Sequence, residues 1–325
     1  MSKSVYLIGA GQIGSRHLQG LKKVKFPLDI TVIDPSRESL RVAAERFALI
    51  PSRIQHRVSY SQTLPKRYIE KIDLAIIATN SNHRLAALRN LLKTAPVRCL
   101  VLEKLLFSKK SEYETAARFL RKNRVRTFIN TGMRMVEHYR GLKNELKDQP
   151  FYYIVTGSNY GLVTNAIHFI DHMAYLTGCT DFSLDTSNLL TKPIESKRKG
   201  FLEFNGTLLV KFKNGIQGTI TSFPSGSLPI IVEIHSPSMR FLLPESSEQA
   251  WTASEKNGWE WHTIPCPFPW QSNLTVPLAT DLLTKKTCNL PRYEESMKLH
   301  LLYLEPLRRF LNEHSQKHYD NYPFT

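Results

Sequence analysis

Several features common in membrane and secreted proteins are missing from the 325-residue sequence. No uninterrupted apolar run approaches the roughly 18 residues of a membrane-spanning helix. A single lysine precedes the first apolar run, so no signal peptide is expected. We therefore expect a cytoplasmic protein with reduced thiols and no membrane partner. Its four cysteines are scattered without a C-x-x-C pair, which argues against a zinc site or a disulfide framework: Cys99, Cys179, Cys266 and Cys288.

Acidic residues are also scarce, because 28 Asp and Glu stand against 44 Lys and Arg, giving a formal net charge of +16. The basic residues are spread along the chain, and the densest groups lie at 22–25, 109–110, 121–124 and 197–199. Dispersed charge favours a solvated surface over a nucleic-acid platform. The resulting field would also attract an anionic cofactor or substrate.

A glycine-rich motif follows the first apolar run, Val5–Ile8, and the pattern then becomes helical. Gly9, Gly11 and Gly14 form G-x-G-x-x-G, the fingerprint of dinucleotide binding when it joins a strand to a helix. The first glycine permits a tight turn, the second lets the backbone approach a pyrophosphate, and the third allows close helix–strand packing. The helix N-terminus then offers free N–H groups to the phosphates. The intervening residues Gln12 and Ile13 are predicted cofactor contacts as well.

An acidic residue follows at the spacing expected for ribose binding. Asp34 lies twenty residues beyond Gly14, directly after the apolar run Ile30–Ile33. Its carboxylate can accept both ribose hydroxyls of NAD and repels the additional phosphate of NADP, so NAD is the predicted cofactor and NADP the less favoured one. Arg37 could lie over the adenine ring, or it could simply be exposed.

Strands and helices alternate through residue 131, which predicts a doubly wound parallel sheet. Ligands bind at the carboxyl ends of such strands. Two further apolar runs, 72–79 and 99–102, have polar residues at these ends. His83 could equally be the solvated start of a helix. The predicted cofactor contacts at these ends are Thr79, Asn80, His83 and Glu103, with Lys104 beside them.

The pattern changes after residue 131. Alternating runs at 206–212, 216–223, 230–234 and 239–243 predict a largely antiparallel open-faced sheet, accompanied by helices at 135–146 and 165–176. Residues 245–290 show no clear pattern, and 292–312 reads as a long amphipathic helix. We therefore expect an α/β protein with a dinucleotide-binding Rossmann domain at 1–131, an α+β substrate and oligomerisation domain at 132–291, and a C-terminal helix at 292–325 that packs back on the core.

The order of these motifs resembles that of the Gfo/Idh/MocA oxidoreductases, which act mostly on sugars, inositols and related polyols. Leu100–Lys104 is similar to the E-K-P element of that family. The resemblance implies that Lys104 contacts substrate and the nicotinamide ribose. It also implies that His168, which matches the histidine of a D-x-G-x-H helix, is the acid/base. A histidine suits proton transfer near pH 7.

The sequence departs from the family pattern at two positions. Leu105 replaces the proline of E-K-P, a position often associated with a bend or a cis bond. Thr164 replaces the acid four residues before His168, with Asn165 next to it. Thr164 and Asn165 can hold a sugar hydroxyl but cannot usefully accept a proton at neutral pH. Either Asp171 or a residue from elsewhere compensates, or the mechanism relies on His168 and Lys104 alone.

Each candidate also has a structural interpretation. A histidine in an apolar helix is often a packed residue, and His168 with His172 has the i, i+4 spacing of helical zinc ligands. Phe169 stands where H-E-x-x-H requires glutamate, so no metal is predicted. Glu103 could orient its loop instead of transferring protons. Arg134 could bind an anionic substrate group or form an ion pair.

Two functions follow from these observations. The first is an NAD-dependent oxidoreductase that transfers hydride between nicotinamide and a sugar or sugar derivative, in carbohydrate or surface-glycan biosynthesis. The second is a non-catalytic, nucleotide-dependent sensor or regulator, for which Thr164 is the motivating feature. A nucleic-acid binder ranks last. The family resemblance also implies a homodimer or homotetramer formed through the sheet of the second domain.

Overall fold

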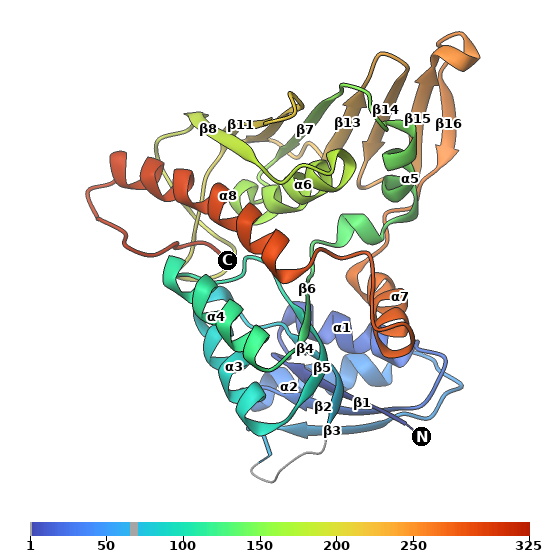
Figure 1. The fold of residues 1–325 in the computed structure, drawn as a ribbon, viewed down its shortest axis with the longest axis vertical. Helices are drawn as coiled ribbons and strands as arrows, with labels where there is room; N and C mark the ends of the chain where they lie inside the picture. Colours follow the sequence, from blue (N-terminus) through green and yellow to red (C-terminus); the bar gives the residue numbers. More distant parts are fainter. Residues whose placement is uncertain (1, 66–70) are drawn as a thin grey trace. The chain divides into compact units, whose positions relative to one another are not determined.

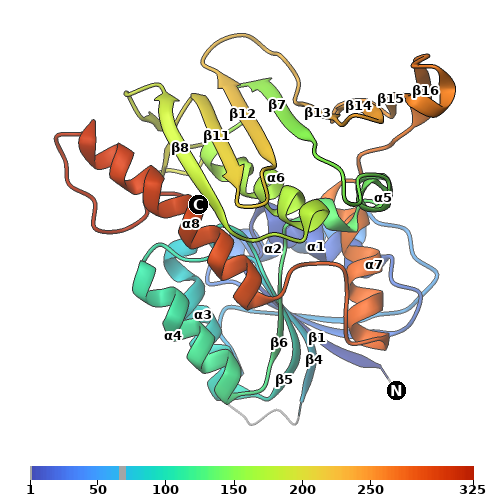
Figure 2. The same ribbon diagram turned by 45° about the horizontal axis from the view of Figure 1, so that its top comes forward.

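The computed structural model describes residues 2–65 and 71–325 and divides into two compact units (Figures 1 and 2). The first unit contains Met1–Met135 and Pro269–Ser296, and the second contains Val136–Phe268 and Met297–Thr325. Residues 269–291, which the sequence assigned to the second domain, thus belong to the first unit. They do so because helix α7 (Gln271–Thr284) packs closely on α1 (Gln12–Lys22) at Gly20, where an added Cβ would lie 2.4 Å from the Ser272 carbonyl oxygen.

The first unit is built on a six-stranded parallel sheet with strand order β3-β2-β1-β4-β5-β6, which confirms the predicted doubly wound fold. Helices α1, α2 and α7 pack together, and α3 lies beside α4 (Figure 1). The remaining bounds are β1 (Lys3–Ile8), β2 (Leu28–Ile33), β3 (Arg57–Ser61), β4 (Ile72–Ile77), β5 (Val97–Leu102), β6 (Arg126–Ile129), α2 (Arg37–Ala48), α3 (Ser81–Thr94), α4 (Lys110–Lys122) and the 3₁₀ turn Gly132–Met135.

Continuous apolar runs make the central strands of this sheet. Leu7, Ile76 and Val101 are completely buried, as expected for strands covered on both faces. Because β2, β1, β4 and β5 are neighbours, their carboxyl ends lie along one edge. The loops after these four strands therefore gather the glycine motif, Asp34, the 79–83 segment and Lys104 at that edge.

The second unit is built on an eight-stranded sheet with order β16-β15-β14-β13-β7-β12-β11-β8, in which only the β7–β12 pair is parallel. The four predicted strands are present, β8 was not predicted, and β15 and β16 lie in the stretch 245–290 that shows no clear sequence pattern. The bounds are β7 (Tyr152–Ser158), β8 (Phe182–Leu189), β11 (Gly206–Phe212), β12 (Gln217–Phe223), β13 (Ile231–His235), β14 (Met239–Pro244), β15 (Gln249–Ser254), β16 (His262–Pro265) and the separate pair β9 (Ile194–Glu195) and β10 (Leu202–Glu203).

Helix α6 (Leu162–Thr177) covers one face of this sheet (Figures 1 and 2). A Cβ added to Gly218 on β12 would lie 2.6 Å from the Met173 sulfur, so helix and strand are in close contact there. Helix α5 (Glu137–Glu145) packs beside α6, and α8 (Tyr293–Glu313) contributes its part from Met297 onward to this unit. Over the described residues, no helix has the length and apolar character needed to cross a bilayer.

Candidate functional site

Each glycine of the fingerprint has a distinct local environment. Gly9 has φ of +95°, and a Cβ there would lie 2.9 Å from the Ala78 carbonyl carbon, so glycine lets the loops after β1 and β4 meet. A Cβ on Gly14 would lie 1.8 Å from the Gly9 carbonyl oxygen, so glycine lets α1 approach β1. A Cβ on Gly11 would meet nothing within 4 Å. The backbone at Gly11, the N-cap of α1, is therefore open to an approaching group.

The Asp34 carboxylate lies against this loop. Its Oδ2 accepts a hydrogen bond from the Ala10 N–H at 2.7 Å, and its Oδ1 accepts one from the Ser36 N–H at 2.8 Å. Asp34 is half-buried, so part of the carboxylate remains accessible. Arg37 is exposed at the start of α2, where its Nε donates to the Gln62 side-chain oxygen at 3.0 Å. Both predicted residues thus follow the carboxyl end of β2, and Asp34 contacts the glycine loop.

The first two helical residues also belong to this region, and a cavity lies at the ends of the two strands that precede it. Gln12 and Ile13 open α1, and the exposed Gln12 accepts a hydrogen bond from Arg46 at 2.9 Å. A cavity of about 780 Å³ includes Ile8 and Ile33, the last residues of β1 and β2, in its lining. The rest of its lining comes from 62–65 and from α3, and none of the predicted cofactor contacts is part of it.

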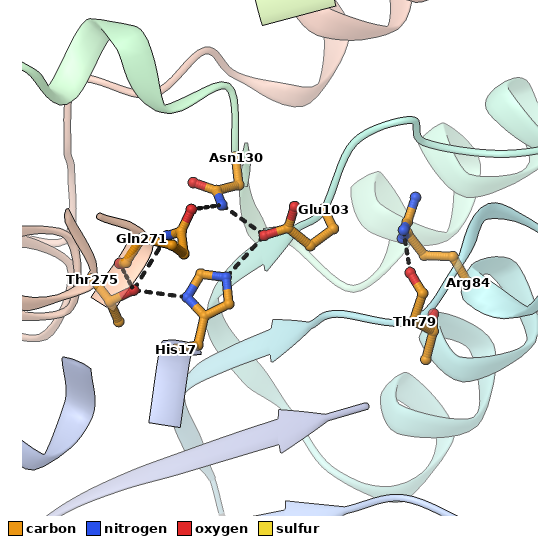
Figure 3. Close-up of polar contacts among 7 residues, drawn as sticks. All are labelled: His17, Thr79, Arg84, Glu103, Asn130, Gln271 and Thr275. Atoms are coloured by element: carbon orange, nitrogen blue, oxygen red, sulfur yellow. Dashed lines mark hydrogen bonds and ion pairs between the residues drawn. The ribbon is translucent and has the colours of Figure 1, made fainter. Parts of the chain in front are cut away.

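The loop after β4 is fixed by a buried arginine. Asn80 caps α3 by accepting a hydrogen bond from the His83 N–H at 3.3 Å, and the His83 side chain is exposed. Arg84 is completely buried, and its guanidinium donates to the Thr79 carbonyl oxygen (Figure 3). It also donates to the carbonyl oxygens of Leu105 and Leu106, the latter at 2.7 Å. Arg84 therefore ties the loop after β4 to the loop that follows Lys104.

Lys104 itself is partly exposed in the loop directly after β5. The Lys104–Leu105 peptide bond is cis. The preceding residue, Glu103, is only 6% exposed. Glu103 is thus buried in the first unit, whereas Lys104 is partly exposed.

The Glu103 carboxylate is held by a buried polar network (Figure 3). It accepts hydrogen bonds from His17 Nε2 at 2.8 Å and from Asn130 Nδ2 at 2.6 Å. The other His17 nitrogen lies 2.9 Å from the Thr275 hydroxyl, which in turn donates to the Gln271 carbonyl oxygen at 2.8 Å. The network joins α1, the ends of β5 and β6, and α7.

His17 links the two halves of this network. Its Nε2 is bonded to the Glu103 carboxylate, and its Nδ1 to the Thr275 hydroxyl, which also accepts a hydrogen bond from the Gln271 side-chain nitrogen at 3.2 Å. Burial alone would raise the pKa of Glu103, but the bonds and charges from His17, Asn130 and Arg84 outweigh it and lower that pKa to about 2.

In the second unit, His168 lies partly exposed on α6, one turn after Thr164. Asn165 is half-buried, and its Nδ2 donates to the carbonyl oxygens of Tyr160 at 2.6 Å and Gly161 at 3.1 Å. The amide group thus holds the loop before α6, while its Oδ1 has no partner among the described residues. Asn165 retains one acceptor for a ligand hydroxyl.

A carboxylate that the sequence reasoning did not identify lies next to Thr164. Glu203 on β10 is buried and accepts hydrogen bonds from the Thr164 hydroxyl and from the N–H groups of Val163 at 2.7 Å and Thr164 at 3.1 Å. The Thr164 hydroxyl also lies 2.9 Å from the Thr325 carbonyl oxygen. Glu203 thus caps the first turn of α6, where Gly161 provides no side chain.

Three further residues that the sequence singled out are buried, and His172 and Arg134 each bond another side chain. Asp171 is completely buried, and His172 bonds the Tyr153 hydroxyl at 2.9 Å through Nδ1. Among residues 2–65 and 71–325, no group of three His, Cys, Asp or Glu side chains is placed to hold a metal ion. Arg134 is buried and pairs with Glu295 at 2.6 Å, which agrees with the ion-pair interpretation.

Comparisons with known proteins agree with this architecture. The TrkA-N domain family matches residues 5–122, which is less than half of the chain. No protein of curated function matches the sequence. The solved structure of levoglucosan dehydrogenase with NADH and levoglucosan is 14% identical, with a TM-score of 0.72 over 97% of this chain and 98% of that one.

Two further solved structures are similar over a comparable length. UDP-N-acetylglucosamine 3-dehydrogenase from Acidithiobacillus ferrooxidans is 12% identical, with a TM-score of 0.67 over 94% of this chain and 96% of that one. An oxidoreductase from Agrobacterium radiobacter in complex with NAD+, L-tartaric acid and magnesium is 16% identical, with a TM-score of 0.68 over 93% and 94%. At these identities the similarity establishes the two-part fold.

Proposed function

We propose that this protein is an NAD-dependent oxidoreductase that transfers hydride between nicotinamide and a hydroxyl or carbonyl group of a sugar or sugar derivative. The observation that carries the proposal is the carboxyl edge of the first unit. There an open backbone at Gly11, the Asp34 carboxylate and the Lys104 ammonium group follow neighbouring strands.

The residues of this edge fit a dinucleotide. The open N-terminus of α1 offers N–H groups to a pyrophosphate, and Asp34 offers acceptors to ribose hydroxyls. The Thr79 hydroxyl is buried and has no hydrogen-bond partner among the described residues, so a bound cofactor could satisfy it. Asp34 favours NAD over NADP because its charge repels a 2′-phosphate. Arg37, Asn80 and His83 are proposed to complete the contacts.

The protein's own residues would position the substrate and handle the proton. When bound, nicotinamide would supply the hydride chemistry. Lys104 is proposed to hydrogen-bond the reacting oxygen and stabilise negative charge on it. His168 is proposed to accept the hydroxyl proton in oxidation and to return it in reduction. Thr164 and Asn165 are proposed to contact other substrate hydroxyls, with Arg134 a weaker candidate because Glu295 already pairs with it.

The nature of the substrate is inferred from the relatives. The dehydrogenases for levoglucosan and for UDP-N-acetylglucosamine share this fold, which supports a sugar as the substrate class here. A role in carbohydrate or surface-glycan biosynthesis is the wider proposal. We also propose a homodimer or homotetramer through the open face of the second unit's sheet.

Binding of NADH and turnover on a sugar panel test the proposal. Lys104→Ala should abolish turnover while changing the NADH dissociation constant less than about 3-fold, because Lys104 acts on the reacting oxygen. Lys122→Ala, an exposed lysine at the end of α4, is the matched control and should behave as wild type. Wild-type turnover in the Lys104→Ala protein would refute the assignment, and NADH binding without turnover on any sugar would favour the regulatory alternative.

A further inference from the structure

An acidic side chain that pairs with no cation among the described residues lies on the covered face of the second unit's sheet. Glu245 directly follows β14, and its N–H donates to the Ile230 carbonyl oxygen at 2.9 Å, which continues the β13–β14 ladder by one pair. Met239, Phe241 and Leu243 are the buried residues of β14. Since side chains alternate along a strand, Glu245 points to the same covered face.

Tyr160 belongs to the same corner of the sheet. A Cβ added to Gly157 would lie 2.9 Å from the Tyr160 ring and 3.3 Å from the Cα of Ile230, so the ring packs over the carboxyl end of β7. Ile230 is also the residue that pairs with Glu245. Gly157, Ile230 and Glu245 thus form one row across β7, β13 and the end of β14, and Tyr160 lies on that row.

The polar groups of this corner are incompletely paired. The Glu245 carboxylate makes no hydrogen bond or ion pair with any described residue, and burial raises its pKa to about 7. The hydroxyls of Tyr139 and Tyr160 are buried and also have no partner in the described part of the chain. Tyr153 differs, because its hydroxyl bonds His172. Buried polar groups are nearly always hydrogen-bonded, so unpaired groups gathered together indicate a ligand site.

The charges around Glu245 define the ligand. Burial is the main cause that raises the pKa values of Tyr139, Tyr153 and Tyr160, and the Glu245 charge adds to it in each case, so all three tyrosines are neutral donors near pH 7. They belong to α5, to β7 and to the loop before α6. A carboxylate among neutral hydroxyls attracts hydroxyl groups and repels an anion.

We propose that Glu245 and Tyr160 form a binding subsite for a neutral, hydroxyl-rich ring, in which the carboxyl of Glu245 and the hydroxyl of Tyr160 hydrogen-bond ring hydroxyls. Glu245 is partly exposed, so a ligand can enter the subsite from the side of the sheet where Glu245 meets solvent. The Tyr160 carbonyl oxygen is bonded to Asn165, which connects the subsite to the turn of α6 that precedes His168. The inference rests on the proposed function and adds a specificity, namely neutral sugars and polyols over sugar acids.

Binding measured without cofactor tests the subsite. The probes are D-glucose, D-galactose and myo-inositol, with D-glucuronate and D-galacturonate as the acids, in calorimetric titrations at pH 8. Wild-type protein should bind at least one neutral probe and discriminate against its acid. Glu245→Gln should reduce that discrimination about 10-fold, because it removes the charge and keeps the size. Tyr160→Phe should weaken binding of the neutral probe about 10-fold.

Glu248→Gln is the matched control, because Glu248 lies three residues after Glu245 and is exposed. It should change neither the affinity for the neutral probe nor the discrimination against its acid. Thermal unfolding establishes that each variant is folded. The subsite is refuted if wild-type protein binds none of the neutral probes, or if Glu245→Gln and Tyr160→Phe bind as wild type does. In that case the protein would still bind NADH and turn over a sugar. If instead the proposed function is wrong, the protein would bind the neutral sugars but show no turnover.

Discussion

His17 and Glu103 lie 86 residues apart in sequence, and the His17 Nε2 is 2.8 Å from the Glu103 carboxylate in the interior of the first unit. His17 belongs to the helix that begins at the glycine motif, and Glu103 immediately precedes Lys104. The pair therefore joins the helix of the proposed cofactor loop to the proposed catalytic lysine. Its contribution to function is positional, because neither side chain is accessible to a substrate.

Removing His17 should destabilise the first unit strongly. His17→Ala leaves the Glu103 charge buried with Asn130 as its remaining side-chain partner, and loss of one member of a buried pair costs about 3–5 kcal/mol. Urea unfolding followed by circular dichroism measures the change in the free energy of unfolding. His318→Ala, which removes a largely exposed histidine, is the control and should change it by less than about 0.5 kcal/mol. A loss below about 1 kcal/mol for His17→Ala would contradict a strong buried contact between His17 and Glu103.

The same pair predicts an acid-dependent loss of stability. The folded pKa of Glu103 is about 2 and its ordinary value is 4.5, so its stabilisation is present above pH 4.5 and is lost as the pH falls toward 2. The full loss is on the order of 3 kcal/mol. Unfolding free energies of wild type and Glu103→Gln, measured from pH 6 to pH 2.5, should converge as the pH falls. Parallel curves would contradict a depressed pKa for Glu103.

The parallel sheet could be predicted because each of its strands is marked by a short stretch of consecutive residues. Apolar runs such as Ile72–Ile77, followed by glycines or polar residues, identify strands and their functional ends without any knowledge of tertiary contacts. Strand β15 and the edge strand β16 could not be predicted in the same way, because they are only partly buried and β15 includes the exposed Trp251. Helix α7 was missed because Pro277 lies inside it and its packing partner, α1, lies about 250 residues earlier.

The sequence pointed to the accessible residues of the proposed site and missed the residues that support them. Gly11, Asp34 and Lys104 carry sequence motifs, whereas the roles of Arg84, Glu203 and Glu245 depend on partners that are distant in sequence. Only His17 offered a signal, because a histidine at a packed position of the fingerprint helix requires a buried hydrogen-bond partner. Pairing that histidine with Glu103 needed the structure.

Two glycines of the fingerprint should separate cofactor binding from folding. Gly11→Ala places a methyl group in open space at a φ of −64° that alanine readily adopts, so the unfolding free energy should change by less than about 1 kcal/mol. The methyl group would occupy the surface proposed for the pyrophosphate, so the NADH dissociation constant should rise at least about 10-fold.

Gly14→Ala is the matched comparison, because its Cβ would lie 1.8 Å from the Gly9 carbonyl oxygen and would force α1 away from β1. It should reduce the unfolding free energy by about 1–3 kcal/mol. Fluorescence titration with NADH and urea unfolding provide the two readouts. Unchanged NADH affinity in a folded Gly11→Ala protein would argue against a cofactor at this loop.

The open face of the second unit's sheet should mediate self-association. The strand register places Tyr152, Phe223 and Trp251 on the face opposite α6, and they are 63%, 44% and 38% exposed. Large apolar side chains gathered on one surface are typical of interfaces. Light scattering after gel filtration should give a multiple of 37.4 kDa for wild type. Tyr152→Lys combined with Trp251→Lys should shift the mass toward the monomer, because it places charges within the apolar contact. Trp270→Lys, at an 80% exposed tryptophan in the first unit, should leave the mass unchanged, and a monomeric wild type would refute the interface.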